Sequence, residues 1–383
     1  MARWLMRYKD GETLPEATIW IDSNELLAQH AGQWQGSIAL DTEFIRTDTF
    51  YPVPGLYQVG WTDQVYLLDP LQISDWSSFV EVLKNPQITK IMHACQEDLE
   101  LIWHHLGISL VNVFDTQLAN AFVSEDFSLS YAALVERLLN VSLPKHATRS
   151  NWLQRPLSDE QLTYAVEDVI YLPKLFQTLT DMLSERAERL SWFEQEMQPR
   201  VSYAPGVSSE YYRGLKKAWQ LNASQLSALR SLCHWREDMA KSLNVPRNRV
   251  VWDDHLYQFA KAGELRHDSV HRALPRAIAR KFADDLVDAH AQGLAQTPPS
   301  KLPAPLSPRQ SAVVKQLRQL GRQRAAALGL APELLSRKRE VEECVRHYVH
   351  AGQMSELFLG WRAEAVGELF EPVFAAEYSG GGG

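Results

Sequence analysis

The first half of the chain alternates short apolar runs with longer amphipathic segments. Runs rich in β-branched and aromatic residues, some of them alternating with polar ones, predict strands at 37–44, 56–61, 64–68 and 90–93. Turn residues separate these runs. Strands that alternate with helices in this way are typical of an α/β domain built around one sheet.

Two helical patterns accompany the strands. Apolar residues after the strand at 90–93 recur at helical spacing, which predicts a strand-to-helix junction near residue 94. Ser158 and Gln161 have the spacing of a capping box, so a second helix should begin there. Its apolar face consists of Leu162, Ala165, Val166, Val169 and Ile170.

After about residue 200 the pattern becomes helical and shows few strand signals. Pro205 and Gly206 mark a linker, and the prolines between 297 and 308 mark a second break. We therefore predict an α/β domain and two helical domains, followed by a flexible glycine tail. Their predicted bounds are 1–200, 208–294, 304–378 and 379–383.

Composition adds an asymmetry of charge. The chain is 45% hydrophobic and 22% charged, which is close to globular averages and excludes a disordered or fibrous protein. The net charge of −8 combines an acidic part, residues 1–200 with 14 Lys and Arg against 28 Asp and Glu, with a basic part, residues 201–383 with 25 against 19. Acidic clusters can hold divalent cations and basic helices attract phosphate, although two ordinary solvated surfaces would give the same counts.

The sequence shows no feature for export or membrane insertion. Its first residues lack the apolar core of a signal peptide, and no stretch approaches about 18 apolar residues. Cys95, Cys233 and Cys344 are odd in number and far apart, which favours free thiols in a reducing cytosol. We therefore expect a cytoplasmic protein with no membrane partner, and a monomer.

Asp41 and Glu43 are the first candidates for chemistry. They stand two residues apart on a predicted strand, so both side chains leave one face while Thr42 is turned away. Two neighbouring carboxylates repel unless a cation lies between them, and Mg²⁺ and Mn²⁺ prefer such oxygen ligands. A solvated strand end is the alternative for this pair alone.

Three further residues extend this pair to a constellation. Asp98 lies near the start of the helix that follows the strand at 90–93. Tyr164 and Asp168 lie one turn apart on the helix that begins at Ser158, away from its apolar face, so they can face one site together.

These residues carry a resemblance. Residues 41–44, 93–100 and 164–168 resemble, in order, the three exonuclease motifs of the DEDD superfamily, in the subgroup whose third motif contains tyrosine. Most of residues 35–180 is similar to the bacterial ribonuclease D family. Residues 210–290 resemble an HRDC (helicase-and-RNase-D C-terminal) domain, and residues 305–378 resemble a second, more divergent copy.

The resemblance implies an RNase H-like exonuclease domain, with a mixed sheet and flanking helices, followed by two all-α HRDC bundles. Asp41, Glu43, Asp98 and Asp168 would hold two divalent ions, Mg²⁺ or Mn²⁺, and Tyr164 would orient the attacking water. A metal pair can activate water and neutralise charge on the leaving 3′ oxygen. The implied activity is a 3′-to-5′ exoribonuclease that trims structured RNA precursors such as transfer RNA and releases nucleoside 5′-monophosphates.

Basic residues are candidates for contacts with the RNA backbone, and a solvated surface is the alternative for each. The candidates are Lys145, Arg149 and Arg155 near the site, and Lys216, Lys217, Arg236, Arg247 and Arg249 in the helical part. Asp115 has the position of a helix cap. His93, His104 and His105 lack the spacing of a zinc protease site.

Two other functions compete with this interpretation. A DNA 3′-to-5′ exonuclease would share the carboxylates and the tyrosine, and the paired HRDC-like segments favour RNA over it. A catalytically silent nucleic-acid scaffold belongs to another class, and the retention of all five site residues argues against it.

Overall fold

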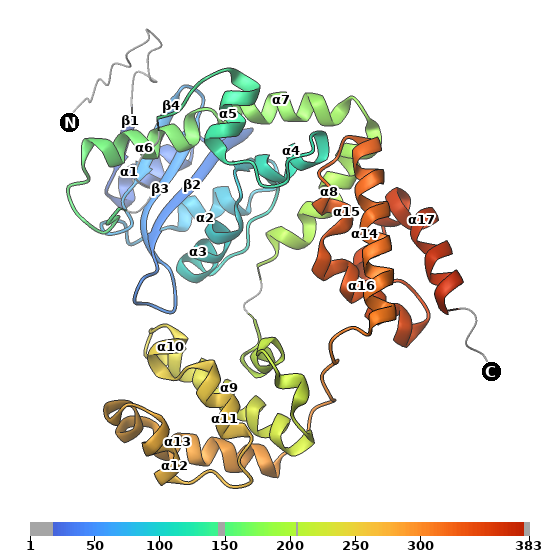
Figure 1. The fold of residues 1–383 in the computed structure, drawn as a ribbon. Coiled ribbons are helices and arrows are strands. Elements are labelled where there is room, and N and C mark those ends of the chain that lie inside the picture. Colours follow the sequence, from blue (N-terminus) through green and yellow to red (C-terminus); the bar gives the residue numbers. More distant parts are fainter. Residues whose placement is uncertain (1–17, 145–149, 204–205, 379–383) are drawn as a thin grey trace. The chain divides into compact units, whose positions relative to one another are not determined.

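The computed structural model describes residues 18–144, 150–203 and 206–378, and Figure 1 shows their secondary structure. The chain forms two compact units. The first holds the described residues up to Ile45, those of Pro54–Tyr203 and those from Leu306 onward. The second holds residues of Arg46–Val53 and the described part of Ala204–Pro305. Within the described residues, no helix has the length and apolar character needed to cross a bilayer.

The first unit contains one mixed sheet of six strands in the order β1-β4-β3-β2-β5-β6. β1 with β4, β2 with β5 and β5 with β6 pair in parallel, whereas β3 and β4 pair antiparallel. The strands are β1 (Thr18–Ile21), β2 (Ser37–Ile45), β3 (Val53–Trp61), β4 (Gln64–Leu68), β5 (Thr89–Met92) and β6 (Val113–Asp115).

The four strands predicted from the sequence correspond to β2, β3, β4 and β5. The prediction missed β1 and β6 because each is short and gains its hydrogen bonds at an edge of the sheet. The predicted junction near residue 94 is also present, since Ala94 has a φ of 54° and α3 begins at Gln96.

Helices cover both faces of this sheet, as Figure 1 shows. On one face, α6 packs against β3 at Gly60. A Cβ atom at Gly60 would lie 3.5 Å from the Val169 carbonyl oxygen of α6. On the other face, Tyr57 of β3 packs against Phe79 of α2 and bonds to His105 of α3. The helices are α1 (Asn24–Ala31), α2 (Ser77–Lys84), α3 (Gln96–Leu106), α4 (Thr116–Val123), α5 (Tyr131–Leu139), α6 (Asp159–Ile170), α7 (Leu172–Ser184) and α8 (Ala187–Val201).

The helix predicted from Ser158 is α6, and its capping box is complete. The Ser158 hydroxyl accepts from the Gln161 backbone N–H, while the Gln161 side chain accepts from the Ser158 N–H. Such caps satisfy backbone donors that a helix start leaves free. The start of the helix that carries Tyr164 and Asp168 is therefore fixed.

The C-terminal helices belong to the same unit as the sheet. They are α14 (Pro308–Leu328), α15 (Glu333–Ser336), α16 (Lys338–Ala351), the 3₁₀ helix η3 (Glu356–Phe358) and α17 (Trp361–Tyr378). Glu196 of α8 accepts hydrogen bonds from the Trp361 indole and the Arg362 guanidinium. Residues 304–378, predicted as a separate domain, thus share one hydrophobic core with the exonuclease part.

The second unit is helical, as predicted. Its two long helices, α9 and α13, pack closely at Gly293 of α13. A Cβ atom at this position would lie only 2.7 Å from the Ala228 Cα of α9, so the close approach requires glycine. Its elements from residue 206 onward are η1 (Ser208–Gly214), η2 (Ala218–Gln220), α9 (Ala223–Ser242), α10 (Arg247–Val250), α11 (Asp253–Ala260), α12 (His267–Ala273) and α13 (Arg276–Ala295). The predicted glycine tail at 379–383 lies outside the described residues.

Candidate active site

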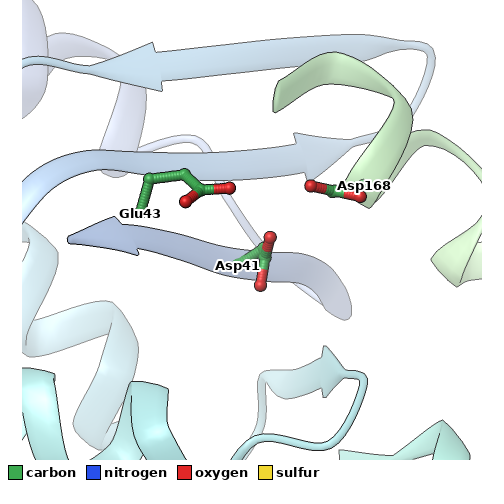
Figure 2. A group of neighbouring side chains, drawn as sticks. All are labelled: Asp41, Glu43 and Asp168. Atoms are coloured by element: carbon green, nitrogen blue, oxygen red, sulfur yellow. The ribbon is translucent and has the colours of Figure 1, made fainter. Parts of the chain in front are cut away.

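Two elements bring three carboxylates together. Asp41 and Glu43 project from β2, and Asp168 faces them from α6, as Figure 2 shows. One oxygen from each carboxylate lies within 4.8 Å of the other two. Residues that are more than 120 positions apart in the sequence therefore form one cluster of oxygen ligands.

Asp98 lies in the first turn of α3 and is buried. Its carboxylate accepts a hydrogen bond from the Thr42 hydroxyl. Burial, and then the nearby charge of Asp41, raise the pKa of Asp98 well above its usual range. Asp98 is not one of the three residues whose oxygens lie within 4.8 Å of one another. Sequence reasoning placed Thr42 away from Asp41 and Glu43 and missed this contact, because the contact depends on how α3 packs against β2.

Burial and like charge raise the pKa of all four carboxyl groups. Burial, and then the charges of Asp41, Asp168 and Asp98, raise the pKa of Glu43 to about 10. Burial raises the pKa of Asp168 to about 7, although a hydrogen bond from Tyr164 opposes this. Burial and the charge of Asp168 hold the pKa of Asp41 well above its usual range. Without a cation, the cluster therefore cannot keep all its carboxylates ionised at neutral pH.

Tyr164 precedes Asp168 by one turn of α6 and donates its hydroxyl hydrogen bond to that carboxylate. Its ring centroid lies 6.1 Å from that of Trp152. Burial, followed by the charges of Asp168 and Glu43, raises the pKa of Tyr164 above its ordinary value of 10. The phenol therefore stays protonated at neutral pH and acts as a hydrogen-bond donor.

The donor set fits a hard divalent cation. It consists of carboxylate oxygens, which Mg²⁺ and Mn²⁺ prefer. The Oδ2 atom of Asp168 is buried and has no hydrogen-bond partner among the described residues. A cation would both use this oxygen and offset the repulsion that raises the pKa values. Asp41, Glu43 and Asp168 are the residues that would hold it, with Asp98 adjoining them.

A polar cavity of about 200 Å³ adjoins Tyr164. It lies between the start of α6 and the segment before it. Its walls are Ser150, Asn151, Trp152, Gln154, Ser158, Glu160, Gln161 and Tyr164. Amide and hydroxyl groups at these positions can bond to the sugar or base of a nucleotide next to the carboxylates.

Arg155 has a structural role and does not match its predicted role as an RNA contact. Its guanidinium forms two hydrogen bonds with the buried Asp69 carboxylate, at 2.8 and 2.5 Å, and donates to the carbonyl oxygens of Gly55 and Trp152. These partners occupy the N–H groups that would bind phosphate. Lys145 and Arg149, the other two basic candidates near the site, lie outside the described residues.

Asp115 and two of the histidines near the site have structural partners. Asp115 caps α4, since its side chain accepts from the backbone N–H groups of Gln117 and Leu118. His93 bonds to the Thr116 hydroxyl and the Leu129 carbonyl, and His105 bonds to Tyr57, so both rings have structural partners. The predicted helix cap is confirmed.

The basic candidates of the second unit differ in exposure. Lys216, Lys217 and Arg249 are exposed, and Arg249 forms a surface ion pair of 2.9 Å with Asp48 of the same unit. Arg247 is half-buried and pairs with Glu237.

Arg236, which the sequence predicts as a phosphate contact, is enclosed by protein partners. It is only 1% exposed, and it bonds to the Val251 carbonyl and the Asp253 carboxylate. A guanidinium enclosed in this way holds helices together, although Arg236 also forms part of the wall of a cavity in this unit. Trp235 also packs in this unit, with its ring 5.6 Å from that of Phe282.

Comparisons with known proteins agree with this geometry. A family model described as 3′-5′ exonuclease matches residues 18–184, and the HRDC domain model matches residues 225–289. Ribonuclease D of Pseudomonas paraeruginosa is 39% identical over 93% of this chain and 97% of its own length. Ribonuclease D of Escherichia coli is 32% identical over 87% of this chain and 91% of its own.

The crystal structure of Escherichia coli RNase D, described as an exoribonuclease involved in structured RNA processing, is similar in fold. It matches with a TM-score of 0.83 and 28% identity, over 94% of this chain and 99% of that chain. The similarity therefore extends through the carboxylate cluster and both helical regions.

Proposed function

The chain belongs to the ribonuclease D family, and from this premise we propose that it is a 3′-to-5′ exoribonuclease that shortens structured RNA. The observation that carries the proposal is the meeting of Asp41, Glu43 and Asp168 oxygens within 4.8 Å. Transfer RNA precursors are the proposed substrates, and nucleoside 5′-monophosphates are the proposed products. We place the enzyme in the cytoplasm as a monomer.

Asp41, Glu43, Asp98 and Asp168 are the proposed ligands of two divalent cations, Mg²⁺ or Mn²⁺. When bound, such ions supply an activated water and offset charge on the leaving 3′ oxygen. The chain itself contributes four carboxylates that balance the cationic charge, and Thr42 holds one of them in place. Asp41, Glu43 and Asp168 are half-buried and Asp98 is buried, which would limit bulk water around the scissile phosphate.

Tyr164 is the proposed orienting residue for the attacking water. Its pKa is raised, so it is a poor base, but its hydroxyl lies on the Asp168 side of the cluster. A neutral phenol can fix the position of a water molecule through a hydrogen bond. The polar cavity beside it would receive the 3′-terminal nucleotide.

The second unit is the proposed docking surface for the RNA. Lys216, Arg247 and Trp252 line one cavity of about 710 Å³ in this unit, and Trp252 is 60% exposed. Cationic side chains attract the phosphate backbone, and an exposed indole can stack on an unpaired base. Lys217 and Arg249 are further proposed contacts. We also propose that residues 304–378 are a second, divergent HRDC bundle.

Digestion of a 3′-extended transfer RNA and a matched single-stranded DNA, each with Mg²⁺ or Mn²⁺, tests the proposed function. We expect stepwise shortening of the RNA to mononucleotides by the wild type. Asp41→Asn should abolish it, while Asp159→Asn, an exposed acid on the same helix as Asp168, should retain it. Preferred digestion of the DNA would favour a DNA exonuclease, and cleavage of neither substrate would favour a binding scaffold.

A further inference from the structure

Gln58 is a buried polar residue in the middle of β3 that has no partner. Its side chain is 0% exposed, and neither the Nε2 nor the Oε1 atom of its amide has a hydrogen-bond partner among the described residues. Buried amides are nearly always bonded, because an unsatisfied amide destabilises the fold. An exception of this kind points to a role in function.

The strand register places Gln58 beside Asp41. β2 and β3 are neighbours in the sheet, and the connection between them, residues 46–52, is too short for the crossover that parallel strands need. They are therefore antiparallel. An ideal Cβ at Gly60 would lie 3.1 Å from the Cβ of Ala39, so these two positions are opposite each other. Two residues further along each strand, Gln58 is opposite Asp41.

Gln58 also lies on the face that carries the carboxylates. Side chains two apart on a strand share a face, so Gln58 is on the face of Gly60, and Asp41 is on the face of Ala39. This face is covered by α6, because the Gly60 Cβ position is 3.5 Å from the Val169 carbonyl oxygen. Asp168 is the residue before Val169. Its buried Oδ2 atom has no hydrogen-bond donor among the described residues.

The Gln58 Nε2 donor, which has no acceptor, and the Asp168 Oδ2 acceptor, which has no donor, thus lie on the face of the sheet that α6 covers. We infer that Gln58 is a positioning residue for the metal centre, and that its amide N–H would donate to the Asp41–Asp168 carboxylate pair when a cation is bound. This inference rests on the proposed function. The neutral amide would orient the carboxylates toward a cation. A lysine at this position would instead compete with the cation, because its own positive charge would pair with the carboxylates. A similar arrangement is present at Asp98, whose carboxylate accepts a hydrogen bond from the Thr42 hydroxyl.

The test compares Gln58→Leu and Gln58→Met with the wild type, all as full-length protein. Mn²⁺ affinity is measured by titration calorimetry of EDTA-stripped protein, together with the melting temperature in EDTA and the exonuclease rate. Both variants remove the amide and nearly keep its volume. Thr180→Val is the matched control, because it removes another unpartnered buried polar group, on α7 of the same unit.

We expect both Gln58 variants to bind Mn²⁺ about 10- to 100-fold more weakly, as loss of an outer hydrogen bond to a ligand does. Their exonuclease rate should recover as the Mn²⁺ concentration is raised, and their melting temperature in EDTA should be unchanged or higher. Thr180→Val should bind Mn²⁺ as the wild type does.

Wild-type Mn²⁺ affinity in both folded variants would overturn the inference and leave the metal centre intact. Loss of the fold in both variants would show a purely structural residue and would also overturn it. Absence of Mn²⁺ binding by the wild type would contradict the metal centre itself, and the inference would fail with it.

Discussion

At the scale of single residues, the fold brings carboxyl groups together although their negative charges repel one another. The fold raises the pKa of Asp168 to about 7 and that of Glu43 to about 10, so the folded chain binds these protons more tightly than the unfolded chain. The stability they contribute is complete below the unfolded values of about 4 and is lost as pH rises through the folded values. A divalent cation would displace the protons, so its stabilising effect should increase with pH.

Asp168→Asn should therefore stabilise the metal-free protein while abolishing activity. The amide resembles the protonated acid and carries no charge into the buried cluster. In EDTA we expect a gain of about 0.5 to 2 kcal/mol in the free energy of unfolding at pH 8, and a smaller gain at pH 5. Urea denaturation at both pH values measures it. A loss of stability at pH 8 would contradict the raised pKa.

Tyr164→Phe separates water orientation from metal binding. The phenyl ring keeps its packing against Trp152, and only the hydroxyl is lost. We expect kcat on RNA to fall about 100-fold or more, with Mn²⁺ affinity within twofold of the wild type. Steady-state kinetics and a Mn²⁺ titration measure the two quantities. An equal loss in both would mean that Tyr164 supports the ligands and does not act on the water.

At the scale of elements, patterns within one segment could be read from the sequence, and contacts between segments could not. The capping box before α6 and the alternation in β3 are local, so both were predicted. The bond from Thr42 to Asp98 and the enclosure of Arg236 depend on packing between elements. Gln58 gave a local signal, a polar residue within an apolar strand, but its partnerless burial appears only in the fold.

The segment that leads into α6 is held to the sheet by Arg155. Asp69, its partner, is 2% exposed, and a Cβ at Gly55 would lie 2.5 Å from the Trp152 Cβ, so the segment lies tightly against β3. Arg155→Ala leaves a buried carboxylate without its cation and should cost about 3 to 5 kcal/mol of stability. Thermal denaturation measures it. An unchanged melting temperature with a raised KM for RNA would restore Arg155 as an RNA contact.

At the scale of the whole molecule, the described residues form two hydrophobic cores. One contains the sheet together with the C-terminal helices, and the other is centred on α9 and α13. Glu196 of α8 joins the exonuclease part to α17 through Trp361 and Arg362, both buried. The Arg362 guanidinium lowers the pKa of Glu196, against the effect of burial, so the carboxylate is charged at neutral pH.

Differential scanning calorimetry should therefore show two transitions, of which Mn²⁺ raises only that of the unit with the carboxylates. Glu196→Ala should lower the same transition, because Arg362 is left buried without its partner. Glu264→Ala removes an exposed ion pair in the other unit and should leave both transitions in place. A single transition that shifts as a whole would contradict the division into two units.

The central claim is that Asp41, Glu43 and Asp168 together hold a divalent cation. Anomalous diffraction from crystals soaked in Mn²⁺ tests it most directly, because it locates the ion without depending on activity. We predict an anomalous peak among these three carboxylates in the wild type, and its loss in Asp168→Asn. No peak there at a Mn²⁺ concentration that supports full cleavage of RNA would contradict the account.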